Sequence, residues 1–322
     1  MKKQINSSVL GWVVLIIILY SIPIYMKNLN WLGILTFANI FVLFAISWDI
    51  SSGHTGYLSL GHTFFIGLGG YASGMLTHHL GFSLFPSIVI SSLFAMVLGT
   101  LIIIPAFRVR GPYFLMLSFA LPLFLTGIVR IGYFTDYTGG HMGLFPLPVF
   151  ASVPDRYKVY YLTLTIMLLI GIPLWRLSKS EIGHILRAIY NDEELVGNLG
   201  FNPFKFKLLA FTVSNFVAGL GGALWVHNMG SVAPHSILDL YIMVQIVIAV
   251  MIGGEGTIIG PILGAYFCVI LLEALQPYAP GPWRLLIFTL IGAGMIAVKP
   301  TGIFIAICQK LDDFIQKKVR GS

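Results

Sequence analysis

The chain has 322 residues, of which 57% are hydrophobic and only 10% are charged, and its mean hydropathy is +0.90. Soluble globular proteins carry about 25% charged residues, so this composition excludes a soluble domain and predicts a polytopic membrane protein. The formal net charge is +7, but the basic residues lie between apolar segments instead of forming one patch, which argues against a nucleic-acid partner. The two cysteines, Cys268 in an apolar segment and Cys308 near the C-terminus, form neither a disulfide framework nor a metal cluster.

Ten apolar segments approach the length of about 17–25 residues that is needed to cross the hydrocarbon core of a bilayer. They lie at approximately residues 9–26, 32–50, 56–78, 84–107, 113–131, 159–177, 208–228, 239–254, 257–275 and 284–299. We therefore predict an all-α polytopic membrane protein with about ten transmembrane helices in a single domain over residues 1–322. The first segment lacks a small-x-small cleavage site, which favours a retained helix over a signal peptide. Between the eighth and ninth segments, GGEGTIIGP can form either a loop or a re-entrant turn.

The basic residues divide unequally between the two sides of this predicted bundle. If the N-terminus is cytoplasmic, fourteen of the 19 lysines and arginines lie inside, and five lie outside: Lys27, Arg130, Arg156, Lys158 and Arg284. Cytoplasmic connections of membrane proteins carry an excess of lysine and arginine. We therefore expect both termini, and the connection at residues 178–207, to face the cytoplasm.

Residues 178–207 form the longest charged interruption of the apolar pattern. Three- and four-residue spacing of apolar side chains predicts an amphipathic helix through Ile182, Ile185, Leu186 and Ile189. Such a helix either lies on the lipid headgroups or docks a soluble partner.

A second short helix is expected to follow in the same connection. Asn191 or Asp192 can cap its N-terminus, with Glu193 and Glu194 in the first turn, where the helix dipole favours acidic side chains. The helix is expected to continue through Leu199 and to stop at Gly200, before Asn202 and Pro203.

Two further connections carry distinct signals. On the outer side, residues 132–158 contain Thr138-Gly139-Gly140 and three prolines, which break regular structure and suggest a small extracytoplasmic cap. Residues 301–320 alternate apolar and charged side chains and predict an amphipathic helix along the inner membrane face. Two glycine-rich segments, residues 53–61 and 253–264, leave open a degenerate internal repeat.

The motifs of nucleotide hydrolysis, metal catalysis and serine hydrolysis are missing from the sequence. It contains no G-x-x-x-x-G-K-[ST], H-E-x-x-H or G-x-S-x-G run. The few acidic residues are scattered at helix ends, so no pair is placed for acid/base catalysis. We therefore expect no enzymatic activity and no cofactor or metal bound by this chain.

Secondary transporters bind their coupling ion through an ionisable residue deep in a span, and here that signal is weak. The polar residues nearest to mid-depth are Asn39, His62, Asn215 and Gln245. Each of them can instead make an ordinary interhelical hydrogen bond. A secondary transporter or passive channel remains an alternative, but it leaves the folded connection at residues 178–207 unexplained.

Small residues predict several close helix contacts. Gly256, Gly260 and Gly264 recur every four residues, so we expect them to share one helix face on which an alanine at Gly260 is still accommodated. The alternative is a mobile hinge over residues 253–261. Gly70-x-x-x-Gly74 and Gly219-x-x-Gly222 offer similar surfaces.

Six motifs in order resemble one family. They are GYLSLGHTFFIGLGGYAS (56–73), RGPYFLMLSFA (110–120), TGGHMGL (138–144), SEIGHILRAIYNDEELVGNLGFNPFKFKLLAF (180–211), AGLGGALW (218–225) and GGEGTIIGPILGAY (253–266). Together they are similar to the LivM-type permease subunits of branched-chain amino-acid ABC importers. The residues that depart from the family pattern are Asn191, Asn198 and the pair His54-Thr55.

The resemblance implies a fold, partners and a location. The fold is a type II ABC importer-like bundle in the bacterial inner membrane. The partners are a second homologous permease, in a heterodimer, two cytoplasmic ATPase subunits that use the ATP, and an extracytoplasmic substrate-binding protein, in addition to membrane lipid. Residues 180–200 then correspond to the loop that touches an ATPase. The substrate is a branched-chain or related amino acid, or alternatively urea or a short amide, which related permeases carry.

Two sets of candidate residues follow from this interpretation. The residues expected to couple to an ATPase are Leu186, Arg187, Ile189, Asp192, Glu193, Glu194, Leu195, Leu199 and Gly200. The residues expected to line the translocation path, as polar side chains at membrane depth, are Asn39, Ser59, His62 and Gln245.

Overall fold

The computed structural model describes residues 16–23, 25, 28–150, 156–279, 282–298 and 302. Helices dominate these residues, and the only β pairing among them is an isolated bridge between Leu144 and Val232. The elements are α2 (Leu29–Trp48), the π-helical η1 (Asp49–Gly53), α3 (His62–His78), α4 (Leu84–Ile103), the 3₁₀-helical η2 (Ile104–Arg108), α5 (Pro112–Arg130), α6 (Gly132–Thr138), α7 (Arg156–Lys179), α8 (Glu181–Asn191), α9 (Glu193–Asn198), α10 (Pro203–Met229), α11 (Pro234–Ile237), α12 (Leu240–Gly253), α13 (Ile259–Leu275) and α14 (Pro282–Val298).

Six helical segments in the described part are long and apolar enough to cross a membrane. They are Leu29–Gly53, Leu84–Arg108, Pro112–Arg130, Arg156–Lys179, Pro203–Met229 and Pro234–Gly253. The shorter helices α3, α13 and α14, of 17 residues each, occupy three more of the ten predicted positions. The all-α polytopic prediction is confirmed.

One predicted segment is shorter in the structure than expected, and two others lie at least partly outside the described residues. The predicted segment 56–78 is helical only from His62, because residues 57–61 form an irregular connection into α3. Residues 16–23 of the first predicted span are helical, and the rest of that span lies mostly outside the described residues. The C-terminal amphipathic helix expected at residues 301–320 also lies outside them, apart from Gly302.

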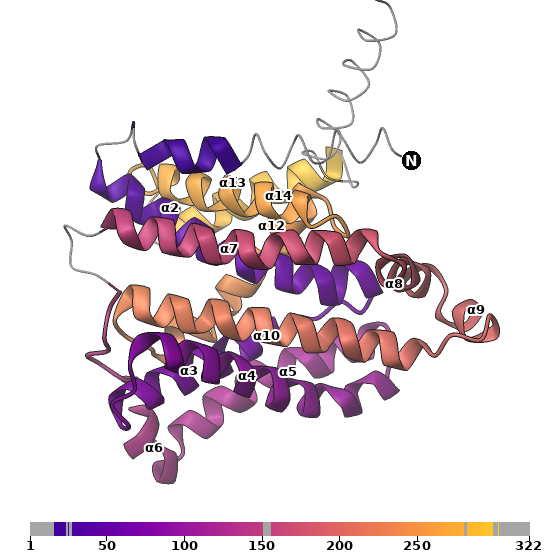
Figure 1. The fold of residues 1–322 in the computed structure, drawn as a ribbon, viewed down its shortest axis with the longest axis horizontal. Coiled ribbons are helices and arrows are strands. Elements are labelled where there is room, and N and C mark those ends of the chain that lie inside the picture. The colour runs from indigo at the N-terminus through magenta and orange to yellow at the C-terminus, as the bar shows by residue number, and fades with distance from the viewer. Residues whose placement is uncertain are drawn as a thin grey trace, which may run out of the picture.

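Helix α2 forms the centre of the bundle. It is apolar all round, which is the pattern of a helix surrounded by protein, and it contacts α7, α10, α12 and α13. Its large side chains Phe41, Phe44 and Trp48 are fully buried. Figure 1 shows α7 and α10 crossing the bundle, with α3, α4 and α5 on one side and α2, α12, α13 and α14 on the other.

Glycines let the backbones of α3 and α10 touch. A Cβ atom at Gly222 would overlap the carbonyl oxygen of Ile66, and one at Gly69 would overlap the backbone of Gly219. Such close approach is typical of membrane bundles, where packing and not a hydrophobic force holds helices together. The α3–α10 contact therefore depends on glycine at these positions.

The expectation that Gly256, Gly260 and Gly264 share one helix face is wrong. Helix α13 begins at Ile259, and Gly256 lies before it, in a turn where its φ is +72°. Gly260 and Gly264 do pack against the backbone of α12, but a Cβ at Gly260 would lie 2.5 Å from the carbonyl oxygen of Gly253. An alanine does not fit at Gly260, because the backbones of α12 and α13 already touch there.

Candidate functional site

The connection between α7 and α10 folds into two short helices at one end of the bundle. Figure 1 shows α8 and α9 beyond the ends of α7 and α10. Asp192, and not Asn191, caps α9: its Oδ1 accepts hydrogen bonds from the backbone N–H of Glu194 and of Leu195, both at 3.0 Å. Gly200 ends this region with a φ of +89°, in the left-handed region that favours glycine.

The apolar face of α8 packs against the protein's own helices. Leu186 and Ile189 are buried, and a Cβ at Gly183 would overlap the carbonyl oxygen of Ser178 at the α7–α8 joint. The Nη2 of Arg187 donates to the same Ser178 oxygen at 2.9 Å. The expectation that Leu186 and Ile189 are free for a partner is therefore wrong, and Arg187 helps to fix α8 against α7.

A different set of side chains is exposed on this connection. Leu195 and Leu199 are 55% and 68% exposed. Leu195 lies on α9 and Leu199 caps its C-terminus, and Phe201 and Tyr190 are exposed nearby in the sequence. We call Leu195, Leu199 and Phe201 the α9 apolar surface. Isolated exposed apolar residues are ordinary, but three within seven residues at a helix end are available to a partner.

Glu193 attaches α9 to the bundle through a cluster of polar contacts. The Nζ of Lys207 donates to its Oε1 at 2.6 Å, and the hydroxyl of Tyr57 donates to its Oε2 at 2.7 Å. Lys207 also donates to the Tyr57 oxygen at 2.8 Å, and its ammonium lies 4.3 Å from the centre of the Tyr57 ring. The Nε of Arg110 lies 3.6 Å from the same carboxylate. We call these four residues the Glu193 cluster.

The cluster holds Glu193 in its charged form. Burial alone would raise the pKa of this carboxyl, but hydrogen bonds from Lys207 and Tyr57, with the positive charges of Lys207 and Arg110, lower its pKa below the ordinary value. Burial and the Glu193 carboxylate raise the pKa of the Tyr57 hydroxyl, so it stays a donor. The contacts join the chain before α3, the connection before α5, α9 and the start of α10.

Tyr190, at the end of α8, makes a second attachment. Its hydroxyl donates to the Oε1 of Glu255 at 2.9 Å, in the turn between α12 and α13. The Tyr190 ring also lies against Gly56, where an added Cβ would be 3.2 Å from it. Burial raises the pKa of Glu255, and the nearby Asp49 charge raises it further, against the lowering effect of the Tyr190 hydrogen bond. One side chain therefore contacts both glycine-rich segments.

Asp49 closes the same turn from inside the bundle. It is fully buried in η1, and its carboxylate accepts from the backbone N–H of Gly256 at 2.6 Å and of Ile258 at 3.2 Å. Its Oδ2 also lies 3.5 Å from the Nδ1 of His54. The turn has positive φ at Gly254, Gly256 and Ile258, and Asp49 supplies acceptors for N–H groups that this irregular backbone would leave unpaired.

The sequence did not single out Tyr57, Lys207, Tyr190 or Asp49 as site residues. The available signals were an acidic residue within an apolar segment, Asp49, and a lysine at the edge of another, Lys207. Their partners lie more than 130 residues away in three of the pairings, Asp49 with Gly256, Tyr57 with Glu193 and Lys207 with Tyr57. Spacing along one chain segment could not reveal them.

Three of the four predicted path residues make contacts inside the bundle. Asn39 bonds Thr163 at 3.2 Å and also accepts from the hydroxyl of Tyr266. His62 bonds Ser47 at 2.7 Å, and Ser59 is buried, with its carbonyl accepting from Trp48 at 2.7 Å. For Asn39 and His62, these are the ordinary interhelical hydrogen bonds that the sequence left open as the alternative to lining a path. Gln245 lines a cavity at the end of the bundle away from α8 and α9.

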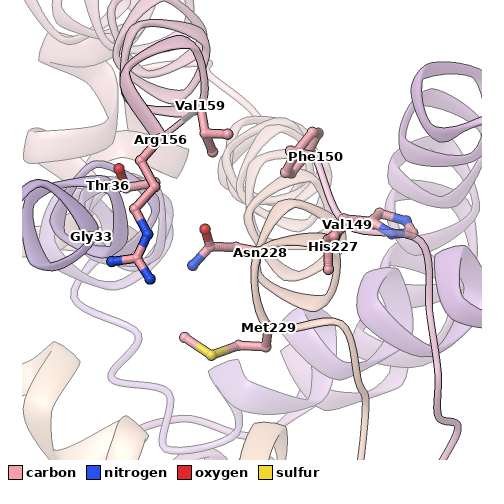
Figure 2. A pocket seen from close by; sticks show the side chains of 9 residues that line it. All are labelled: Gly33, Thr36, Val149, Phe150, Arg156, Val159, His227, Asn228 and Met229. Carbon is pink, nitrogen blue, oxygen red and sulfur yellow. The ribbon is translucent and has the colours of Figure 1, made fainter. Parts of the chain in front are cut away.

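Two adjoining cavities open at that opposite end. One, of about 320 Å³, lies between α2, α7 and α10; Figure 2 shows the guanidinium of Arg156 between α2 and the side chains of Asn228 and Met229. The other, of about 760 Å³, shares Gly33, Arg156 and Met229 with it. No group of three or more metal-ligating side chains occurs among the described residues.

A polytopic helical bundle with a folded connection at one end and cavities at the other fits a membrane transport component. Comparison with known proteins makes this specific. Residues 30–298 match the family described as the branched-chain amino acid transport system / permease component, and the chain belongs to this family.

Individual relatives agree with the family. The chain is 27% identical over 283 residues to the high-affinity branched-chain amino acid transport system permease protein LivM of Escherichia coli, covering 79% of this chain and 65% of the relative. It is 23% identical over 199 residues to a probable LivM permease of Methanocaldococcus jannaschii, covering 60% and 56%. It is also 27% identical over 220 residues to the autoinducer 2 import system permease LsrC of an Enterobacter strain, covering 65% and 60%. The chain thus spans about two thirds or less of the length of each relative.

Proposed function

We propose that this chain is the permease subunit of an ATP-driven importer and forms half of the translocation path for branched-chain or related amino acids. In this proposal the ATP is hydrolysed by two separate cytoplasmic ATPase subunits, a second homologous permease completes the path, and an extracytoplasmic binding protein delivers the substrate. The chain lies in a bacterial inner membrane with both termini and α8–α9 in the cytoplasm. The LivM relatives and the distribution of basic residues support this arrangement.

The observation that carries the proposal is the attachment of the α9 apolar surface. A helix that merely rests on lipid needs no fixed orientation toward the bundle, whereas a surface that receives force from a partner must be held rigidly. The Glu193 cluster and the Tyr190–Glu255 hydrogen bond hold α8 and α9 at two separate points. Leu195 and Leu199 remain free for the partner, with the exposed carboxylate of Glu194 beside them.

The substrate class has one specific alternative. LsrC relatives are named as permeases for autoinducer 2, so the family accommodates solutes other than amino acids. Urea and short amides form a further alternative. A secondary transporter or channel is disfavoured, since the buried polar residues Asn39 and His62 are occupied by internal hydrogen bonds and are not free to bind a coupling ion.

Docking is tested by co-purification of the whole transporter. Leu199→Asp and Leu195→Asp place a charge on the α9 apolar surface and are expected to reduce recovery of the ATPase subunits about tenfold or more, because truncating a central apolar anchor commonly costs about 2 kcal/mol. Met142→Asp is the matched control, since Met142 is an exposed apolar residue away from this surface, in the chain beyond α6. It is expected to leave recovery unchanged.

Two outcomes would contradict the proposal. Normal recovery of both ATPases with Leu195→Asp and Leu199→Asp would reject the docking role. Uptake of labelled leucine that persists without ATP hydrolysis and collapses with an ionophore would instead identify a secondary transporter.

A further inference from the structure

The larger cavity lies at the end of the bundle remote from α8 and α9. Its volume is about 760 Å³, within the range of about 300–1,000 Å³ that small-molecule sites occupy. Helix α7 leads into α8 and α10 follows α9, so the start of α7 and the end of α10, which both line the cavity, lie at the other end of the molecule (Figure 1). We call this space the outer vestibule.

The vestibule combines an equal number of positive and negative side chains. It is lined by Arg156 and Arg284 and by Asp239 and Glu273. Two of the four have local partners: the Nη1 of Arg156 donates to the carbonyl oxygen of Leu29 at 3.0 Å, and Asp239 caps α12 by accepting from Tyr241 at 3.1 Å.

Glu273 and Arg284 differ from the other two charged residues. Within the described part of the chain, neither side chain has a hydrogen bond or an ion pair, and both are only partly exposed. Partly buried charges are normally paired, because desolvation without a partner is costly. A ligand that carries both charges would pair the two of them at once.

The remaining wall of the vestibule is largely apolar. Phe37 and Trp225 contact each other with ring centroids 5.8 Å apart, and Ile242, Val269 and Leu272 continue the surface. An apolar wall next to one free cation and one free anion matches a zwitterion that has a hydrocarbon side chain.

We propose that the outer vestibule receives the amino acid as it leaves the binding protein, with Arg284 binding its carboxylate and Glu273 its ammonium group. The aliphatic side chain then lies against Phe37 and Trp225. An arginine binds a carboxylate through two parallel charge-assisted hydrogen bonds, which fixes the orientation of the solute. This inference rests on the proposed function, since it assigns that permease a solute-binding site.

A zwitterionic lipid headgroup also carries an ammonium group and an anionic group, and the acyl chains of that lipid would cover the same apolar wall. We commit to the free amino acid because the vestibule also holds polar groups well suited to a small solute, including Gln245 and His235. The two sources differ in their response to membrane composition. Phosphatidylethanolamine in the bilayer would compete with leucine if the headgroup were the occupant.

The first test uses the complete transporter in proteoliposomes, with leucine uptake measured over a range of concentrations. Glu273→Gln and Arg284→Gln are each expected to raise the concentration for half-maximal uptake about 10- to 100-fold, because each variant removes a charged group that hydrogen-bonds to the amino acid. Asp136→Asn, which neutralises an exposed acid on α6 outside the vestibule, is the control and is expected to behave as wild type.

Each result is decisive. No leucine uptake by wild type would contradict the proposed function itself. Wild-type uptake together with unaltered concentration dependence in both glutamine variants would overturn the vestibule site alone. A change in the variants that occurs only in liposomes containing phosphatidylethanolamine would assign the site to lipid and also overturn the inference.

A second measurement tests the site even if the two glutamine variants fail to assemble into a transporter. Ser236→Cys places a thiol in the vestibule, in a chain with Cys268 and Cys308 replaced by serine. Leucine is expected to slow its reaction with a charged thiol reagent several-fold, whereas leucinamide, which lacks the carboxylate, is expected to give no protection. Equal labelling rates with and without leucine would refute the site.

Discussion

Replacing Lys207 with methionine tests how firmly the Glu193 cluster holds α9. Methionine keeps an unbranched apolar side chain of similar length but removes the ammonium that donates to Glu193 and to Tyr57. The Lys207 side chain is only 3% exposed and that of Glu193 15% exposed. Removing one partner of a buried ion pair costs about 3–5 kcal/mol. Tyr57 and Arg110 remain next to the carboxylate, so we expect a loss at or just below the lower limit of that range, about 2–3 kcal/mol.

A double-mutant cycle separates the pairing from other effects of the substitution. Lys207→Met and Glu193→Gln are each expected to destabilise the protein, and the double variant is expected to lose less than the sum by about 1.5 kcal/mol or more. Free energies come from reversible unfolding of the purified chain in mixed detergent micelles. Arg110→Gln is the control; its side chain is 58% exposed, and exposed pairs contribute about 1 kcal/mol or less.

Additive effects would refute this reasoning. If the double variant matches the sum of the singles within about 0.5 kcal/mol, Lys207 and Glu193 do not stabilise one another, and the contact at 2.6 Å has no energetic weight. The cluster could then not be the attachment that orients α9.

Three other changes have defined outcomes. The fold lowers the pKa of Glu193. Its contribution to the free energy of unfolding is therefore fully present above its unfolded pKa of about 4.3 and is lost as the pH falls through the lower folded value. The stability difference between wild type and Glu193→Gln should shrink on acidification below about pH 4.3. Gly264→Ala should lower the melting temperature of the complex by several degrees, because the added methyl overlaps the carbonyl of α12, while Gly127→Ala, with open space around it, should leave it unchanged or raise it slightly. Tyr190→Phe removes the hydrogen bond to Glu255 and should reduce transport relative to ATP hydrolysis, measured together in proteoliposomes, without loss of the ATPase subunits.

Local pattern was sufficient to predict the helices around the candidate site. The amphipathic spacing over α8 depends on residues within eleven positions, and the cap at Asp192 depends on the N–H groups of the two residues that follow Glu193. Helix periodicity and capping are properties of neighbouring residues, so one sequence reveals them.

The direction of the apolar face of α8 could not be predicted in the same way. An amphipathic helix shows which side chains cluster but not what covers them, and Leu186 and Ile189 are covered by the protein itself. The exposed pair, Leu195 and Leu199, lies in the short α9 region, where six helical residues give too little periodicity to define a face. The prediction for Gly256 failed for a related reason. Four-residue spacing places glycines on one face only if the helix includes them all, and α13 begins three residues after Gly256.

The α12–α13 hairpin connects the two regions of the molecule that we assign to function. At one end, the turn between these helices is held by the Asp49 carboxylate from inside and by Tyr190 of α8 from outside, through Glu255. At the other end, Gln245 of α12 and Glu273 of α13 line the outer vestibule. Between the ends, Gly260 and Gly264 bring α13 into backbone contact with α12, and interiors packed so closely transmit displacement instead of absorbing it. A movement imposed on α8 therefore has a continuous packed connection to the residues proposed to hold the amino acid. This is the reason to measure transport and ATP hydrolysis together in Tyr190→Phe: severing the hydrogen bond at the turn tests the connection without altering the α9 apolar surface or the vestibule.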